Sequence, residues 1–193
     1  MKHPILGLHH VTATVGDAQV DLSFCIGVLG LRWYPFSFME EVAKNEPGIS
    51  SGLQVLDQLV IDVVARGVRK EYIVLLGFSQ GACLAAQFAV SHAGRYGGVI
   101  IFSGGLIFSG GLIGPPGTTW DLAGSFAGTP VFLGCSDIDF HVPKARVDES
   151  AAMFERMVAQ VTKRLYAGMG HLINDDEIAF ARTMMDRVGG TPK

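Results

Sequence analysis

Residues 77–81 form the pattern Gly-x-Ser-x-Gly, which is typical of serine nucleophiles. The pattern directly follows a strand-like apolar run, residues 72–76, and directly precedes a helix-like segment, residues 82–92. A tight turn from strand to helix lifts the serine oxygen off the sheet, and the flanking glycines let the two backbones pass closely. The N–H of Gln80 then faces a developing oxyanion. We therefore expect Ser79 to be a nucleophile and Gln80 an oxyanion-hole donor, with a purely structural turn as the alternative.

A serine nucleophile requires a histidine base, and a carboxylate must orient that base. For a serine on such a strand–helix turn, the expected chain order is Ser, then Asp or Glu, then His. Downstream of Ser79, the strand-like run 130–135 leads into Asp137 and Asp139, and the run 163–167 leads into His171. Both loops follow the carboxyl end of a strand, where parallel sheets bind ligands. His171 is the predicted base, and the residues alone leave Asp137 and Asp139 open as the acid.

The other histidines fit the role of base less well. His141 lies only two residues past Asp139 on the same loop, so we interpret it as a surface or cleft-wall residue. His3, His9, His10 and His92 fall in the wrong order or place.

Strand-like and helix-like segments alternate along most of the chain. This alternation predicts an α/β fold, with a mostly parallel sheet and helices on both faces. The expected helices cover residues 50–66, 82–92, 146–160 and 175–187, and the expected strands cover residues 72–76, 98–102, 130–135 and 163–167.

The composition favours a globular protein without a nucleic-acid partner. The 193 residues suit a single domain, and the charged residues amount to 17% against 49% hydrophobic residues. The net charge is −3, and no basic run is present. The most apolar stretch, residues 97–114, is interrupted by two Ser-Gly-Gly triplets, so we interpret it as a buried strand plus a loop and expect no membrane insertion.

The cysteines and the N-terminus favour a reducing, cytoplasmic location. Cys25, Cys83 and Cys135 are widely spaced and odd in number, and they form no zinc-ligand pattern. The first residues are a poor match to a signal peptide. One local irregularity is a tandem hexamer, in which residues 101–106 are repeated at once as residues 107–112. Its even length preserves the alternation of a strand, so one copy can pair in a sheet while the other joins the loop.

From residue 32 to about residue 185, the chain resembles the phospholipase/carboxylesterase family of α/β-hydrolases, which includes acyl-protein thioesterase-like enzymes. The resemblance implies Ser79 as nucleophile and His171 as base. It also implies Asp139 as the acid, because the family's aspartate lies four residues before the proline that Pro143 matches. The implied activity is hydrolysis of carboxylic esters or thioesters without a cofactor. The matching motifs are RWYPFSF (32–38), NEPG (45–48), GFSQG (77–81), SGGL (103–106), DFHVP (139–143) and YAGMGH (166–171).

The N-terminal part departs from this family. Family members open with strands and a His-Gly-rich loop that supplies a second oxyanion N–H, and nothing of that kind precedes Arg32. Residues 1–31 instead resemble the opening of ring-cleaving dioxygenases of the vicinal-oxygen-chelate superfamily, in which a first-strand histidine, here His9 or His10, helps to hold a metal. About thirty residues do not supply the remaining ligands, so we expect no metal. The predicted organisation is a dioxygenase-like segment, 1–31, packed on a hydrolase domain, 32–193, whose sheet is N-terminally truncated or rearranged.

The predicted function is a serine carboxylesterase that hydrolyses small acyl esters through an acyl-enzyme. Trp33 and Tyr34 are candidates to line an acyl pocket, although aromatic residues this dense are as often part of a core. The alternative is a catalytically impaired remnant or interaction protein that lacks a complete oxyanion hole. A third hypothesis, a metal-dependent dioxygenase-like protein, has only residues 1–31 in its favour. An exposed sheet edge after loss of the opening strands would favour a homodimer.

Overall fold

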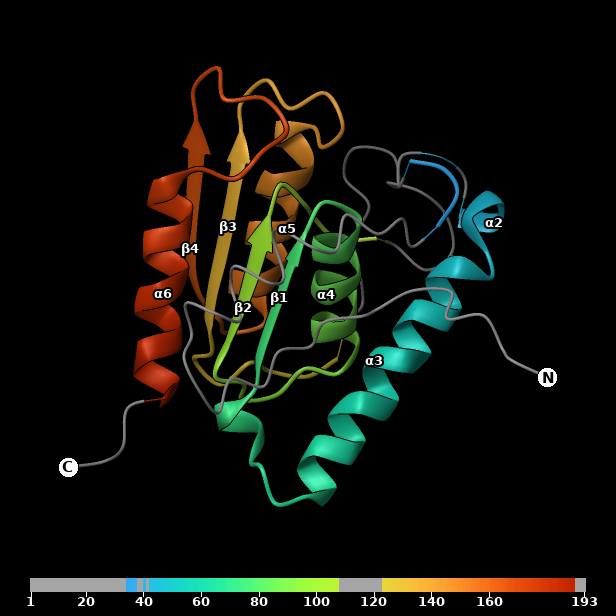
Figure 1. Cartoon of the computed structure of the whole chain (residues 1–193), viewed down its shortest axis with the longest axis vertical. Helices are drawn as coiled ribbons and strands as arrows, with labels where there is room; N and C mark the ends of the chain where they lie inside the picture. Colours follow the sequence, from blue (N-terminus) through green and yellow to red (C-terminus); the bar gives the residue numbers. More distant parts are fainter. Residues whose placement is uncertain (1–33, 38–39, 41, 108–122, 190–193) are drawn as a thin grey trace.

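The computed structural model describes residues 34–37, 40, 42–107 and 123–189 of the chain. Its centre is a parallel four-stranded sheet in the order β1-β2-β3-β4, with all carboxyl ends at one edge (Figure 1). The strands are β1 (Val74–Phe78), β2 (Gly98–Phe102), β3 (Pro130–Ser136) and β4 (Gln160–Tyr166). The helices are α2 (Val42–Asn45), α3 (Gly48–Ala65), the 3-10 helix η1 (Lys70–Tyr72), α4 (Gln80–Ser91), α5 (Lys144–Arg156) and α6 (Asp175–Gly189).

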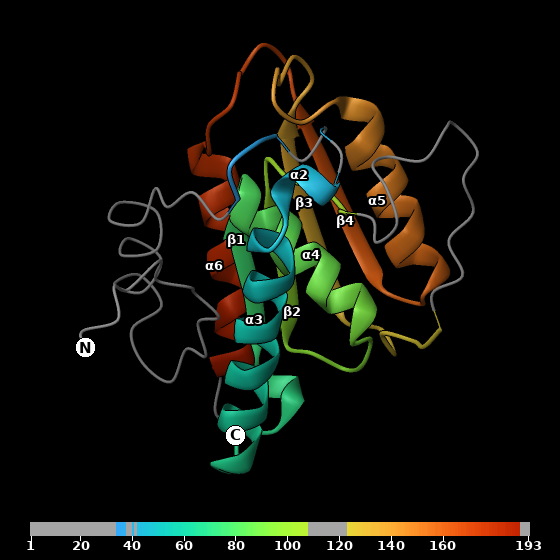
Figure 2. The same ribbon diagram turned by 90° about the vertical axis from the view of Figure 1, so that its right-hand side faces the viewer.

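Helices cover both faces of the sheet, as the sequence predicted (Figures 1 and 2). On one face, Leu75, Ile101 and Leu133 pack in a core with buried residues of α3, α4 and α5. On the other face, alternate strand residues such as Ile100 and Phe132 pack against α6. The two cores follow from the twofold alternation of strand side chains. The fold is therefore the predicted α/β class.

The strands' sequences reflect their places in the sheet. Every residue of β2 is buried, and six of the seven residues of β3 are buried, as expected of central parallel strands covered on both faces. Strand β4 lies at the edge of the sheet and carries exposed polar residues. Its pairing with β3 begins at Gln160, three residues before the predicted start, because the polar residues Gln160 and Thr162 gave no strand signal. The helix expected over residues 146–160 is α5, which ends at Arg156, so the prediction that it continues to residue 160 is wrong. Strand β1 begins two residues later than predicted, because Tyr72 belongs to η1.

Two apolar segments that bear on membrane insertion belong to the described domain. The apolar residues 98–102 form the buried strand β2, whose last two residues open the tandem repeat. Ile107 opens the second copy of the repeat, and the rest of that copy, residues 108–112, lies outside the described residues. By length and composition alone, α3 would suffice to cross a membrane. Its residues Ile49, Leu56 and Val60 pack in the core of the domain.

Candidate active site

Ser79 occupies a strained turn between β1 and α4. Its backbone angles are φ 55° and ψ −124°, in a region that non-glycine residues rarely adopt. Backbone hydrogen bonds hold the turn: the N–H of Ser79 donates to the carbonyl of Phe102 at 2.9 Å, and the N–H of Cys83 donates to the carbonyl of Ser79 at 3.0 Å. A Cβ on Gly77 would collide with the backbone of Gly81, so this glycine permits the close passage that the motif predicts.

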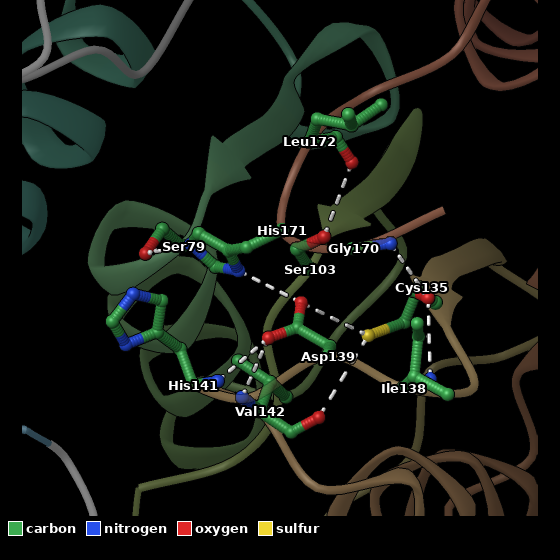
Figure 3. A network of polar contacts seen from close by, with 11 residues as sticks. Ser79, Ser103, Cys135, Ile138, Asp139, His141, Val142, Gly170, His171 and Leu172 are labelled. Carbon is green, nitrogen blue, oxygen red and sulfur yellow. Dashed lines mark hydrogen bonds and ion pairs between the residues drawn. The ribbon is translucent and has the colours of Figure 1, made fainter. Parts of the chain in front are cut away.

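The structure brings Ser79, His171 and Asp139 together in one chain of hydrogen bonds (Figure 3). His171 Nε2 lies 2.9 Å from Ser79 Oγ, and His171 Nδ1 lies 2.7 Å from Asp139 Oδ2. The three residues follow the carboxyl ends of β1, β4 and β3, which lie at the same edge of the sheet. With the proton on Nδ1, the imidazole donates to the carboxylate and Nε2 accepts the hydroxyl proton of Ser79.

The hydrogen bonds around Asp139 favour its ionised form. The residue is 8% exposed, and its Oδ1 accepts the backbone N–H groups of His141 at 2.8 Å and Val142 at 2.9 Å. The thiol of Cys135 lies 3.6 Å from Oδ2. Burial alone would raise the pKa of this carboxyl, but the hydrogen bonds from His171, Val142 and His141 outweigh burial and hold the pKa below its usual value.

The neighbouring carboxyl, Asp137, contacts a different part of the site. It is exposed, and its Oδ1 accepts the N–H of Gly168 at 2.8 Å, on the loop that carries His171. The residues alone left both acids open, and the structure places Asp139 against the imidazole.

The side chain of Gln80 anchors a segment beside the turn. Its Nε2 donates to the carbonyls of Tyr34 at 3.1 Å and Phe36 at 3.3 Å, and its Oε1 accepts the N–H of Tyr34 at 3.4 Å. Sequence reasoning missed this contact, because nothing in the spacing of two residues 46 positions apart indicates it. The assignment of the Gln80 N–H to an oxyanion hole stays a prediction.

Of the two aromatic residues proposed for an acyl pocket, the structure describes only Tyr34. Trp33 lies outside the described residues. The ring of Tyr34 is 2% exposed and packs in the core, where burial raises the pKa of its hydroxyl. Little of this ring is open to a substrate, so its role as a substrate contact stays a prediction.

Exposed apolar side chains lie near the histidine instead. Phe140 is 77% exposed and its ring lies 6.2 Å from the ring of His171, and Leu172, the next residue in the chain, is 46% exposed. The ring of Phe78 lies 4.9 Å from the ring of His171 between centroids, and the exposed ring of His141 lies 4.6 Å from it. His141 thus borders the site, beside the predicted base, and sequence reasoning did not identify Phe78, Phe140 or Leu172 as part of this rim.

Within the part of the chain that the structure describes, no three His, Cys, Asp or Glu side chains form a group that could hold a metal ion. His9 and His10, which carry the dioxygenase resemblance, lie outside that part. The expectation of no metal stays a prediction.

Comparison with known sequences settles the family. A sequence model of the Phospholipase/Carboxylesterase family matches residues 21–188. The chain belongs to this family. The match begins inside the segment that we compared with ring-cleaving dioxygenases, and the comparisons do not support that second resemblance. The division of this family member at residue 31 stays a prediction.

Two proteins named acyl-protein thioesterase 1 are similar to most of the chain. The protein of Saccharomyces cerevisiae is 30% identical over 173 residues, which are 88% of this chain and 69% of the relative. The protein of Eremothecium gossypii is 28% identical over 166 residues, which are 81% of this chain and 66% of the relative. The chain therefore spans about two thirds of the length of these relatives.

One solved structure supports the same assignment, and a second shows the same fold. The crystal structure of a phospholipase/carboxylesterase from Dyadobacter fermentans is 40% identical, with a TM-score of 0.72 over 79% of this chain and 70% of that chain. Arabidopsis thaliana SOBER1 is 17% identical, with a TM-score of 0.62 over 84% of this chain and 76% of that chain, and shows the fold alone.

Proposed function

We propose that this family member is a serine carboxylesterase that hydrolyses acyl esters through a covalent acyl-enzyme. The observation that carries the proposal is the continuous contact from Ser79 Oγ through His171 to Asp139. A serine hydroxyl that is hydrogen-bonded to an imidazole, with the imidazole oriented by a buried carboxylate, is the arrangement that activates serine for acyl transfer.

The reaction proceeds in two halves. His171 Nε2 takes the proton of Ser79 Oγ as the oxygen attacks the ester carbonyl, and the N–H of Gln80 stabilises the resulting oxyanion. The tetrahedral intermediate collapses when His171 gives that proton to the leaving alkoxide, so that an alcohol departs and Ser79 is acylated. Water then loses a proton to His171, attacks the acyl carbonyl, and releases the carboxylic acid when the proton returns to Ser79.

The rim of the site favours substrates with an apolar acyl part. Phe78 and Phe140 are exposed, and their rings lie 4.9 Å and 6.2 Å from the ring of His171, where the acyl or alcohol part of an ester would lie. The same serine chemistry cleaves thioesters, and two similar proteins are named acyl-protein thioesterase 1. We therefore propose small acyl esters as substrates and include thioesters of the same acyl groups in the test.

The alternative function is a catalytically impaired remnant or interaction protein that keeps these residues but lacks a complete oxyanion hole, with the N–H of Gln80 as the one expected donor. Loss of one such donor lowers kcat by roughly 10²–10³-fold in a serine hydrolase. Hydrolysis of p-nitrophenyl acetate, butyrate and octanoate, and of the matching thioesters, separates the two proposals. We expect turnover well above that of a Ser79→Ala variant. A wild-type rate equal to that of the variant on every substrate would favour the impaired remnant.

A further inference from the structure

The acid and the base of the site lie on separate loops. Asp139 lies three residues past the end of β3, and His171 lies five residues past the end of β4. The two loops must hold a fixed separation, because a contact of 2.7 Å joins Asp139 Oδ2 to His171 Nδ1. Backbone pairing of β3 with β4 ends at Ser136 and Tyr166, before either loop reaches its side chain.

One buried hydroxyl joins these two loops beyond the sheet. Ser136, the last residue of β3, is 0% exposed. Its Oγ accepts the N–H of Ile138 at 3.2 Å and the N–H of Gly170 at 3.0 Å. Ile138 immediately precedes Asp139, and Gly170 immediately precedes His171 (Figure 3). A single oxygen therefore contacts the residue before the acid and the residue before the base.

We propose that Ser136 is a positioning residue that sets the separation of Asp139 and His171, an inference that rests on the proposed function. A serine hydroxyl has two acceptor lone pairs, which is the number needed for two N–H donors. Two other polar side chains also contact the base loop: Asp137, on the acid loop, accepts the N–H of Gly168, and Ser103 donates to the carbonyl of Leu172 at 3.3 Å. Ser136 differs from the exposed Asp137 in being buried and in contacting the residues directly before the acid and the base.

Removal of this hydroxyl leaves the N–H groups of Ile138 and Gly170 without this acceptor, so the two loops are free to shift relative to one another. Misplacement of a catalytic group by about 1 Å can lower the rate by roughly 10²-fold. The loss should appear in kcat more than in KM, since Ser136 is fully buried and a bound substrate would not contact it directly.

The same strand offers a matched control at its other end. Thr129, immediately before β3, is 0% exposed, and its Oγ1 accepts the N–H of Tyr96 at 2.9 Å and donates to the carbonyl of Phe126 at 2.7 Å. It is thus a buried hydroxyl that joins two segments far from Ser79. Thr129→Val removes this link as Ser136→Ala removes the other, so both variants report loss of a buried hydroxyl and only one lies at the site.

The test compares kcat for ester hydrolysis and the proton NMR signal of the His171 Nδ1–H that bonds Asp139. We expect Ser136→Ala to lower kcat roughly ten- to hundredfold and to shift or broaden that signal. We expect Thr129→Val to leave kcat within about twofold and the signal unchanged. Ser136→Thr, which keeps the hydroxyl, should retain both. A Ser136→Ala variant with wild-type kcat and an unshifted signal would overturn the proposal, as would equal effects in Thr129→Val.

Two further outcomes are informative. If the wild type proves inactive, the proposed function fails, and the Nδ1–H signal alone decides whether Ser136 positions the pair. If Ser136→Ala does not fold, Ser136→Cys takes its place, because it keeps a side chain of similar size and replaces the hydroxyl by a weak acceptor. Wild-type values of both readouts in Ser136→Cys would then contradict the proposal.

Discussion

Asp137 and Asp139 are chemically alike and two residues apart, yet they contact different groups. Asp139 is buried against His171, whereas Asp137 is exposed and accepts the N–H of Gly168. In the proposed mechanism Asp139 orients the imidazole and stabilises its positive charge. Asp137 tethers the loop.

This difference predicts unequal effects of the same substitution. Asp139→Asn should lower kcat by roughly 10³–10⁴-fold, because an amide holds the wrong tautomer of His171. Asp137→Asn should lower kcat by less than about tenfold, because the amide oxygen still accepts the Gly168 N–H. Steady-state hydrolysis of a p-nitrophenyl ester measures both values. A larger loss in Asp137→Asn would reverse our assignment of the acid.

At this scale the sequence identified the reacting residues better than the residues that support them. Ser79 is marked by its motif, and His171 by its place after a strand. The choice between Asp137 and Asp139 needed either a family resemblance or the structure, since both acids follow the same strand. The contacts of Gln80 and Ser136 depend on how distant backbones approach one another, which the spacing of residues does not encode.

Among the elements, the start of α6 holds an unusual carboxyl. Glu177 is 0% exposed and shares reciprocal hydrogen bonds of 2.9 Å with Asn174, the geometry of a capping box. Its other oxygen, Oε1, has no hydrogen-bond partner among the described residues, and a Cβ on Gly134 would collide with it. Burial raises the pKa of Glu177 from 4.5 to about 7. The negative charge of Asp176 adds to this rise, and the hydrogen bond from the Asn174 N–H opposes it.

This raised pKa predicts a stability that depends on pH. The folded state favours the neutral acid of Glu177. Its contribution to the free energy of unfolding is therefore fully present below pH 4.5 and is lost as pH rises through about 7. The corresponding loss in free energy of unfolding is on the order of 3 kcal/mol. Glu177→Gln should remove this part of the pH dependence, as measured by urea unfolding at about pH 5 and pH 8. If the variant lost as much stability between the two pH values as the wild type, Glu177 would not be its source.

The close backbone contact at the Ser79 turn leads to a second prediction, which concerns the free energy of unfolding. Gly77→Ala places a methyl group against the backbone of Gly81 and Ala82, which has no flexible end that could move aside. We expect a loss of at least about 2 kcal/mol in the free energy of unfolding. Gly94→Ala is the matched control, because its added Cβ would meet its nearest atom, Lys70 Nζ, at an ordinary 3.7 Å. Equal thermal stability of the two variants would contradict the close passage at the turn.

The order of helices and strands followed from hydrophobic patterning, whereas some element ends did not. Buried strands such as β2 are continuous apolar runs and are easily found. The start of β4 is polar because it forms a sheet edge, and edge position is a property of the assembled sheet.

At the scale of the whole molecule, strand β1 forms one edge of the described sheet. It pairs with β2 on one side, and among the described residues no strand pairs with its other side. We propose that residues 1–31 cover this edge or that a second subunit pairs with it, because an uncovered edge promotes association. In both possibilities, the edge of β1 is covered by residues that are not part of the four strands that the sequence predicted.

Deletion of residues 1–31 tests this proposal. If the segment covers the edge, the shortened chain should unfold at a lower temperature and associate more strongly, as measured by thermal unfolding and by sedimentation. Ser79 labelling by a fluorophosphonate reports whether the site persists. Unchanged stability and assembly would count against a covering role, and lost turnover with retained fold and labelling would indicate that the segment contributes to catalysis.

The central claim is that Ser79 is an activated nucleophile, and covalent labelling tests it most directly. A fluorophosphonate probe followed by peptide mass spectrometry should place the adduct on Ser79, because this hydroxyl contacts His171 at 2.9 Å. Ser79→Ala should abolish labelling, whereas Ser91→Ala, which removes an exposed serine at the far end of α4, should label as the wild type does. Labelling that persists in Ser79→Ala, or an adduct on another serine such as Ser103, would contradict the account.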